Sequence, residues 1–313
     1  TNVGGAERVL KSIHDLFPKA PIYTSQYDPK GIDWFKDADV RTGSLQKYSP
    51  KLRKFLAQLR QRYFSNLDLS DYDLIISVTG AEAKGVKKGK ARHICYCHVP
   101  TQYYWQLYDD YVKNPGFGKL NFLVRPAFKS LVGSLRKKDY QDAQKPDEYI
   151  TISKYAAEQI KKYYHRDATV IAPPVRVEKF SSVKDGKREG FINASRQVNW
   201  KRLDLAIEAC LENKESLTLI GDGPEHEKLV KLASGSPLIK FKKPVGRPEL
   251  SKYLANSKGY IFPSLEPFGI APVEALAAGC PVIAYGEGGA LDYVKDGKNG
   301  ILFDKQNVTS LCE

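Results

Sequence analysis

Short apolar runs alternate with amphipathic stretches along the first half of the chain. The runs have the length of buried strands, and they cover residues 21–24, 40–42, 74–78, 94–97, 149–152 and 169–172. Between them, apolar residues recur at helical spacing, first over 6–17, where Val9, Ile13 and Leu16 share one face. This alternation of strands with helices predicts one doubly wound α/β domain.

The polar run SSVKDGKREG interrupts the pattern and predicts a linker. We place the linker at residues 176–189, between a first domain over 1–175 and a second domain over 190–313. Strands of the second domain are predicted at residues 191–194, 217–220, 260–262 and 282–285. An amphipathic helix over 203–210 separates the first two of them, so the second domain is expected to be α/β as well.

The stretch GYIFPSLEPFGIAPVEALAAGCPVIAYG, residues 259–286, has the order strand, loop, helix, strand. This is the order of a right-handed βαβ crossover in a parallel sheet. Ligands of such sheets bind at the carboxyl ends of the strands, which makes the loop over 263–271 a predicted binding loop. Its last amides precede a helix N-terminus, which favours an anion, and they belong to Phe268, Gly269 and Ile270.

Two carboxylates flank these amides. Glu266 lies in the loop and Glu274 is expected in the first turn of the helix over 272–278, where both can accept hydrogen bonds from sugar hydroxyls. The alternative is that Glu266 is a solvated loop residue and Glu274 a favourable charge at the start of a helix.

Further polar residues follow other predicted strands. Arg196 and Lys201 leave the strand 191–194 just before a helix and suit a diphosphate, although two solvated surface cations would have the same pattern. His98 ends the strand in RHICYCH and is either a ligand contact or a structural histidine. Glycines that precede helices can let an anion approach the backbone, and these are Gly4, Gly5 and Gly221.

No metal site or cofactor is expected. Asp37 with Asp39, and Asp71 with Asp73, have a D-x-D spacing, but both pairs precede their strands instead of following them. We interpret them as turns at which strands begin. Five cysteines, an odd number scattered through apolar segments, predict reduced thiols and a cytoplasmic protein.

Basic residues concentrate in the first half of the chain. Residues 1–165 carry 28 Lys and Arg against 17 Asp and Glu, net +11, and residues 166–313 carry 21 against 19, net +2. Segments 51–64 and 119–138 combine apolar stripes with cations, as in helices that lie on anionic bilayers. Alternatively, each stripe faces the core. Our hypothesis is peripheral membrane contact; no nucleic-acid recognition module is visible.

A family resemblance adds to these patterns. EPFGIAPVE and its continuation ALAAGCPVIAYGEGGALDYVKDGKNGILF resemble the E-x7-E block of the family 4 retaining glycosyltransferases. GGAERV, HVPTQYYW, SRQVNWKRLDLAIEA and GDGP also come in the order of that family. The resemblance implies the GT-B fold, in which two Rossmann-like doubly wound domains face each other across a cleft that holds the active site.

The same resemblance implies roles for the candidate residues. Arg196 and Lys201 would stabilise the leaving diphosphate, and the amides of 268–270 would hold sugar and phosphate. Glu266 and His98 would contact the donor sugar, and Glu274 the ribose hydroxyls. Gly4, Gly5 and Gly221 would lie against the donor. Departure of a nucleoside diphosphate develops negative charge, which cations and amides can stabilise without a metal.

Within the family, VGGAERVL, HVPTQYYW and ASRQVNWKRLDLAI most resemble bacterial mannosyltransferases that build O-antigen and other surface polysaccharides. This implies GDP-mannose as donor and a lipid-linked glycan as acceptor, handled on the inner face of the plasma membrane. A UDP- or ADP-sugar donor and a non-catalytic sugar-nucleotide-binding or scaffold protein remain alternatives. The sequence has no methionine, so we expect it to lack its true start, with a first strand, and its C-terminal helices.

Overall fold

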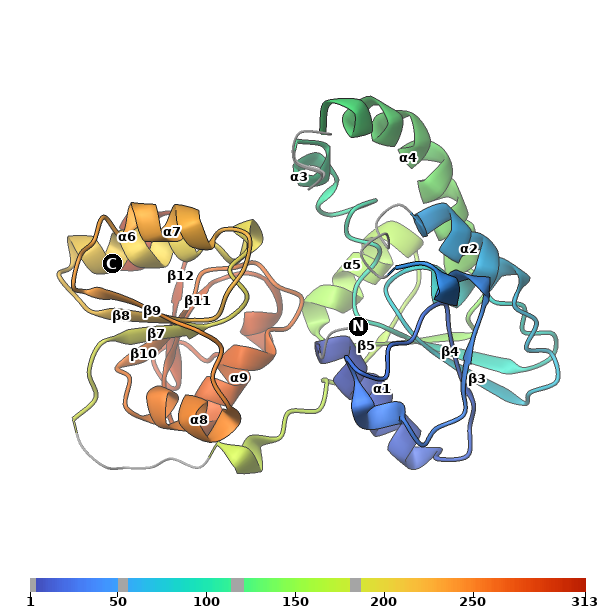
Figure 1. Cartoon of the computed structure of the whole chain (residues 1–313), viewed down its shortest axis with the longest axis horizontal. Coiled ribbons are helices and arrows are strands. Elements are labelled where there is room, and N and C mark those ends of the chain that lie inside the picture. Colours follow the sequence, from blue (N-terminus) through green and yellow to red (C-terminus); the bar gives the residue numbers. More distant parts are fainter. Residues whose placement is uncertain (1–3, 50–55, 114–120, 181–186) are drawn as a thin grey trace. The chain divides into compact units, whose positions relative to one another are not determined.

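The computed structural model describes residues 4–49, 56–113, 121–180 and 187–313. The chain divides into two compact units, Thr1–Pro174 and Val175–Glu313, and each is built from parallel strands and helices (Figure 1).

The first unit carries two parallel sheets among its described residues, one with the order β1-β2 and one with the order β3-β4-β5-β6. Its strands are β1 (Ile22–Thr24), β2 (Val40–Thr42), β3 (Leu74–Val78), β4 (Arg92–Cys97), β5 (Glu148–Thr151) and β6 (Thr169–Val170). Its helices are α1 (Gly5–Leu16), α2 (Ala57–Asn66), α3 (Tyr108–Lys113), α4 (Asn121–Ala143) and α5 (Lys154–Tyr164), with a short 3-10 turn η4 (Glu82–Gly85).

All six strands predicted in this half are present, and they pair in parallel as the predicted α/β fold requires. The four-stranded sheet keeps the order of the chain, and β1 and β2 pair apart from it. Hydrophobic periodicity predicts where strands lie; long-range pairing decides their order in the sheet.

The second unit is doubly wound, with one parallel sheet of order β12-β11-β10-β7-β8-β9. Its strands are β7 (Phe191–Ala194), β8 (Leu217–Ile220), β9 (Ile239–Lys242), β10 (Gly259–Phe262), β11 (Val282–Tyr285) and β12 (Gly300–Phe303). Its helices are α6 (Leu203–Glu212), α7 (His226–Leu232), α8 (Arg247–Ala255), α9 (Ile270–Ala277) and α10 (Val308–Cys312).

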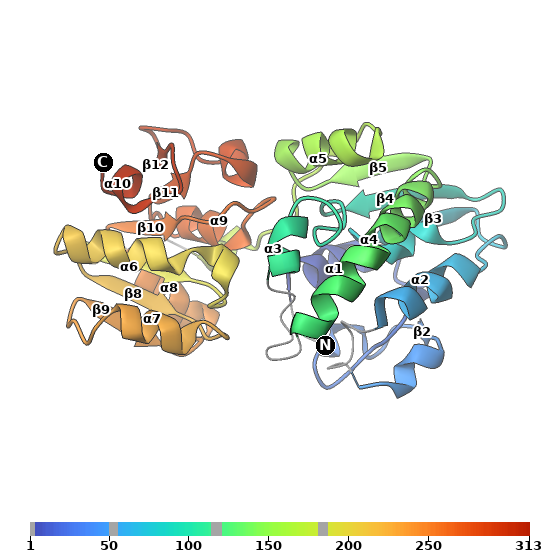
Figure 2. The same ribbon diagram turned by 90° about the horizontal axis from the view of Figure 1, so that it is seen from above.

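Helices cover both faces of this sheet, α6 and α7 on one and α8 and α9 on the other (Figures 1 and 2). The alternation of side chains along β10 builds both cores. Tyr260 and Phe262 belong to the cluster that contains α8 and α9 side chains, and Ile261 belongs to the cluster of α6 and α7. The fully apolar run at 260–262 is therefore a central strand buried on both faces.

The predicted linker 176–189 is described in part. Residues 181–186 lie outside the described residues, but Phe180 is buried in the core of the second unit beside α8 and α9. The start of this segment therefore packs as part of the second unit.

The predicted membrane-facing segment 51–64 is described from Leu56 onward. Leu56 is buried, whereas Leu59 is 45% exposed. Arg60, expected to be one of the surface cations, instead forms an ion pair with Glu82 of η4 at 2.8 Å, with both side chains largely buried. This cation is neutralised inside the first unit and does not face solvent.

The predicted stripe of 119–138 divides between core and surface. Leu135 is buried beside Tyr104, and Phe128 packs against the same cluster, whereas Leu131 is 43% exposed. Phe122, near the start of α4, is 69% exposed. Residues 119 and 120 lie outside the described residues. None of the helices in the described part of the chain has the length and apolar content needed to span a bilayer.

Candidate active site

The sheet of the second unit changes direction between β7 and β10. From β7 the chain proceeds to β8 and β9 on one side, and it then crosses to β10, β11 and β12 on the other. The loops that leave β7 and β10 therefore diverge, and doubly wound sheets bind their ligands outside the carboxyl ends of the strands at this point. Both predicted cation positions follow β7, and the predicted binding loop follows β10.

Lys201 and Glu266 meet at this switch point. Lys201 ends a 3-10 turn, Asn199–Lys201, and its Nζ forms an ion pair with Glu266 Oε1. Ser264 donates a second hydrogen bond to the same oxygen, at 2.7 Å. Lys201 Nζ also lies 6.0 Å from the centroid of the Phe262 ring. The alternative that Glu266 is a solvated loop residue does not hold, because its carboxylate is paired and only 19% exposed.

Arg196 lies one residue beyond Ser195 in the loop after β7 and is exposed. The root of this loop is fixed by Asn193, whose buried amide donates to Ile261 O of β10 at 2.8 Å and accepts from Ser195 Oγ at 2.6 Å. We did not predict a role for Asn193. Its signal in the sequence is a polar side chain inside an otherwise apolar strand.

Helix α9 begins at Ile270, two residues before the predicted start. Glu274 is consequently its fifth residue, so its predicted place in the first turn is wrong. Glu274 is 7% exposed. Gly269 caps the helix with φ +87°, and a Cβ there would lie 2.6 Å from Phe262 Cζ. Only glycine therefore fits at this point, which lets the helix start early.

Hydrogen bonds from the loops that follow β11 and β12 hold the loop between β10 and α9. Gly289 N–H donates to Glu266 O at 2.8 Å, and Gln306 Nε2 donates to Pro263 O at 2.7 Å. A Cβ on Gly289 would lie 2.2 Å from Pro267 O, so the two loops touch through their backbones. The N–H groups of residues 268–270 lie at the start of α9, where N–H groups have no partner within the helix.

Gly221, at the end of β8, packs on the loop after β7. Its φ is +143°, and a Cβ would lie 2.0 Å from Ser195 O. Gln197, 1% exposed, joins these loops: its Nε2 donates to Gly221 O at 3.1 Å, and its Oε1 lies 2.7 Å from His226 Nδ1 of α7. The structure thus assigns Gly221 a packing role beside Arg196, and the predicted donor contact stays a prediction.

The remaining candidates lie in the first unit. His98 follows the last residue of β4, and its Nε2 is buried without a hydrogen-bond partner among the described residues. Burial lowers the pKa of His98 to about 4, so the ring is neutral at neutral pH. Gly4 is the N-cap of α1, and Gly5 is its first residue.

The segment after His98 is fixed by a buried carboxylate. Asp139 of α4 accepts hydrogen bonds from Thr101 Oγ1 at 3.0 Å and Trp105 Nε1 at 2.7 Å, and also from Tyr164 of α5 at 2.8 Å. Lys84 Nζ, fully buried, lies 2.6 Å from the same carboxylate. Burial acts to lower the pKa of Lys84, but Asp139 and the other nearby groups leave it raised, so the lysine stays protonated.

The two D-x-D pairs occupy the predicted positions, because β2 begins after Asp39 and β3 begins after Asp73. Asp39 forms an ion pair with Arg41, at 2.7 Å. Among the described residues, no three His, Cys, Asp or Glu side chains gather as metal ligands would.

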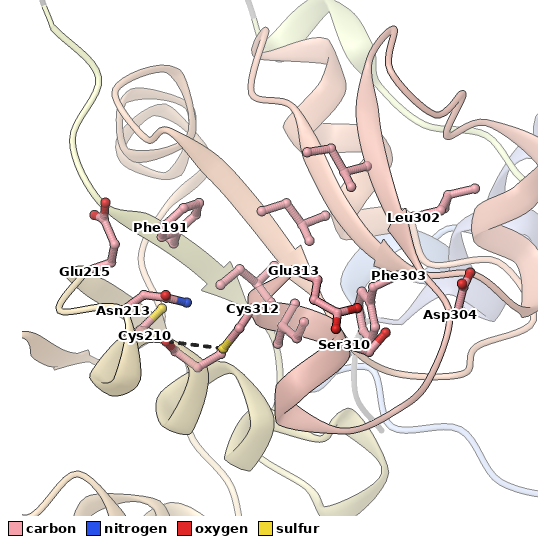
Figure 3. A pocket seen from close by; sticks show the side chains of 15 residues that line it. Phe191, Cys210, Asn213, Glu215, Leu302, Phe303, Asp304, Ser310, Cys312 and Glu313 are labelled. Atoms are coloured by element: carbon pink, nitrogen blue, oxygen red, sulfur yellow. Dashed lines mark hydrogen bonds between the residues drawn. The ribbon is translucent and has the colours of Figure 1, made fainter.

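A cavity of about 540 Å³ in the second unit contains none of the predicted site residues (Figure 3). Its walls come from α6, α10 and the apolar side chains of the sheet, among them Phe191 and Phe303. Cys312 Sγ lies 4.0 Å from Ala209 O there (Figure 3). No Lys or Arg side chain lines this cavity. It therefore lacks the cations that mark the candidate active site.

Residues 174–313 match the family model described as Glycosyl transferases group 1. This match covers the second unit, with its paired Lys201 and Glu266. The second unit therefore resembles a group 1 glycosyltransferase domain.

Curated relatives match about half of this chain or less. An uncharacterized glycosyltransferase of Methanocaldococcus jannaschii is 31% identical over 171 residues, which are 53% of this chain and 48% of that protein. A GDP-mannose-dependent alpha-(1-6)-phosphatidylinositol monomannoside mannosyltransferase of Mycolicibacterium smegmatis is 30% identical over 142 residues, 40% of this chain and 37% of that protein. The chain thus spans about half the length, or less, of these relatives.

A solved structure extends the likeness to both units. The crystal structure of Anabaena HepE in complex with UDP and glucose matches with a TM-score of 0.66 at 19% identity, covering 99% of this chain and 84% of that chain. The chain therefore has the GT-B glycosyltransferase fold, as predicted.

Proposed function

We propose that the protein is a retaining glycosyltransferase that moves mannose from GDP-mannose to a lipid-linked or polysaccharide acceptor. The observation that carries the proposal is the pairing of Lys201 with Glu266 at the switch point of a group 1 domain, beside the N-terminus of α9. A cation, a carboxylate and a helix N-terminus are the groups that a diphosphate and a sugar require.

The charge that develops on the leaving diphosphate is stabilised by Lys201 and Arg196, together with the amides of 268–270. The amides are held in the backbone at the start of α9 before the reaction, so they need little reorganisation in the transition state. Donor binding exchanges the partner of Lys201: its ammonium moves from Glu266 to the diphosphate, and the released carboxylate accepts hydrogen bonds from the sugar.

Retention follows from attack on the same face as departure. The C1–O bond to the diphosphate breaks, the acceptor oxygen bonds to C1, and the acceptor proton passes to the departing phosphate oxygen. This route needs no catalytic base. It also needs no nucleophilic carboxylate of the glycosidase type.

The choice of donor and acceptor is supported by the mycobacterial relative, whose name gives GDP-mannose as donor and a phosphatidylinositol mannoside as acceptor. The Anabaena structure holds UDP and glucose, so a UDP-sugar is the donor to test against GDP-mannose.

An acceptor carried by a lipid places the protein at the cytoplasmic face of a membrane. We propose that α4 makes this contact, because Phe122 is exposed on the same helix face as the exposed Arg125 and Lys129. Apolar side chains flanked by cations suit an anionic bilayer surface. Flotation with anionic liposomes tests this; we expect salt-sensitive binding that Phe122→Ser weakens, and no binding would reject the membrane contact.

The activity is tested by following the release of GDP, UDP or ADP from their hexose conjugates, with and without a polyprenyl-diphosphate-linked glycan. We expect acceptor-stimulated release from GDP-mannose and an α-linked product by NMR. Release from a UDP- or ADP-sugar alone would keep the enzyme class and replace the donor. Nucleotide binding with no turnover would favour a non-catalytic sugar-nucleotide-binding protein.

A further inference from the structure

Tyr293 reaches the binding loop from the turn that follows β11. Its hydroxyl oxygen lies 2.6 Å from Phe268 O and 3.2 Å from Gly269 O. Its ring packs edge-on against Phe268, with 5.4 Å between the ring centroids. One phenol therefore contacts two consecutive peptide groups at the start of α9.

These two contacts fix the direction of two amides. The chain has no cis peptide bond in its described residues, and in a planar trans peptide the C=O and N–H groups point in opposite directions. The carbonyl of Phe268 shares its peptide with the N–H of Gly269, and the carbonyl of Gly269 shares its peptide with the N–H of Ile270. Holding both oxygens at Tyr293 turns both N–H groups away from it.

We propose that Tyr293 is a positioning residue that aims the Gly269 and Ile270 amides at the diphosphate of the donor. The inference rests on the proposed function of this site. Tyr293 does not touch the ligand in this account; it acts through the backbone.

The surroundings of Tyr293 support this role. Burial raises the pKa of the phenol, with Glu266 adding to the effect, so the hydroxyl keeps its proton and acts as a donor. A Cβ on Gly269 would lie 2.9 Å from the Tyr293 oxygen, so the hydroxyl occupies the space that any side chain there would need.

The test compares Tyr293→Phe with Tyr149→Phe. Tyr149 is a matched control, because it is buried in the first unit and donates to the backbone carbonyl of Ala143 at 2.9 Å. Backbone NMR spectra are recorded for the full chain without ligand. Affinities are then measured for GDP, UDP, inorganic pyrophosphate and guanosine.

Without ligand, we expect Tyr293→Phe to shift or broaden the amide signals of Gly269 and Ile270, and Tyr149→Phe to leave them in place. Affinity for the preferred nucleoside diphosphate should fall about tenfold in Tyr293→Phe, the effect of one lost hydrogen bond. The affinity for guanosine, which has no phosphate, should be the same in Tyr293→Phe and in the unsubstituted protein.

Unchanged Gly269 and Ile270 signals in Tyr293→Phe would overturn the inference, and so would a diphosphate affinity equal to that of Tyr149→Phe. If the unsubstituted protein binds neither GDP, UDP nor pyrophosphate, the proposed function fails instead. The ligand-free spectra then still decide whether Tyr293 orients the two amides.

Discussion

Lys201 and Glu266 are 65 positions apart in the sequence, yet Lys201 Nζ lies 2.5 Å from Glu266 Oε1 at the switch point of the second sheet. The side chains keep 18% and 19% of their surface exposed. An ion pair that solvent still reaches can open when a ligand offers the lysine and the carboxylate stronger partners. A diphosphate for the lysine and sugar hydroxyls for the carboxylate meet that condition.

We expect Lys201→Ala and Glu266→Ala each to lower the turnover rate by about 10²–10³, as when one group that stabilises a transition state is removed. Turnover of the preferred donor under saturation measures this. Stability should fall less than when a fully buried pair is broken, because both side chains keep about a fifth of their surface exposed. Near-normal turnover in either variant would refute the assignment.

Lys258→Ala provides the matched control for these variants. Lys258 pairs with Glu215 at 2.8 Å, as Lys201 pairs with Glu266, but neither residue belongs to the loops after β7 and β10. We expect unchanged turnover in Lys258→Ala. An equal loss in this variant would show that the rate responds to surface charge in general.

Gly269→Ala should weaken donor binding and destabilise the fold. The φ of +87° costs a residue with a side chain about 1–3 kcal/mol, and the new methyl group meets Phe262 and Tyr293. Gly235→Ala is the control, because Gly235 has φ +70° and no atom within 4 Å of the position that its new methyl group would take. Calorimetric titration with GDP should show a lower affinity only in Gly269→Ala. Equal affinities in both variants would contradict a special role for position 269.

Asp139→Asn should destabilise the first unit by about 3–5 kcal/mol, because it leaves the buried ammonium of Lys84 without its counter-charge. Chemical unfolding measures the loss. Asp39→Asn removes the carboxylate of an exposed pair with Arg41 and should lower the stability much less. Similar losses in the two variants would mean that the buried pair contributes no more than a surface pair.

The stability of the first unit should fall as the pH falls from about 6.5 to about 4. The pKa of His98 is lowered by burial to about 4, below its ordinary value of 6.5, so the unfolded chain binds a proton first. The contribution is present above pH 6.5 and is lost as the pH drops through the folded pKa. Burial also lowers the pKa of His93 to about 4, so His98→Gln should reduce, and not abolish, the change in unfolding free energy over this range. An unchanged slope would mean that His98 is not buried as described.

The strands of both units could be predicted where apolar runs are short and bounded by turn residues, as at 260–262 and 282–285. The strands β9 and β12 were missed. In β9, IKFK alternates apolar and charged residues over only four positions, and β12 follows a glycine-rich turn that hides its pattern. The reversal of strand order between β7 and β10 depends on packing across the sheet and leaves no local signal.

The candidate site was predictable in part for a similar reason. Glu266 and Lys201 could be singled out from their places after predicted strands and from family resemblance, but their contact depends on β7 and β10 being neighbours. Tyr293 and Asn193 act through backbone groups, which the sequence does not show. The early start of α9 at Ile270 depends on the backbone that Gly269 adopts, and the apolar pattern alone gave a later start.

Thermal unfolding in the presence of GDP, UDP, ADP and their hexose conjugates tests the central claim most directly. A nucleotide at about 100 times its dissociation constant should add about 2.7 kcal/mol to the stability, a clear rise in the unfolding midpoint. We predict that GDP and GDP-mannose raise the midpoint and that Lys201→Ala removes most of the rise. No shift with any of these nucleotides would contradict the proposal that this site binds a nucleoside diphosphate sugar.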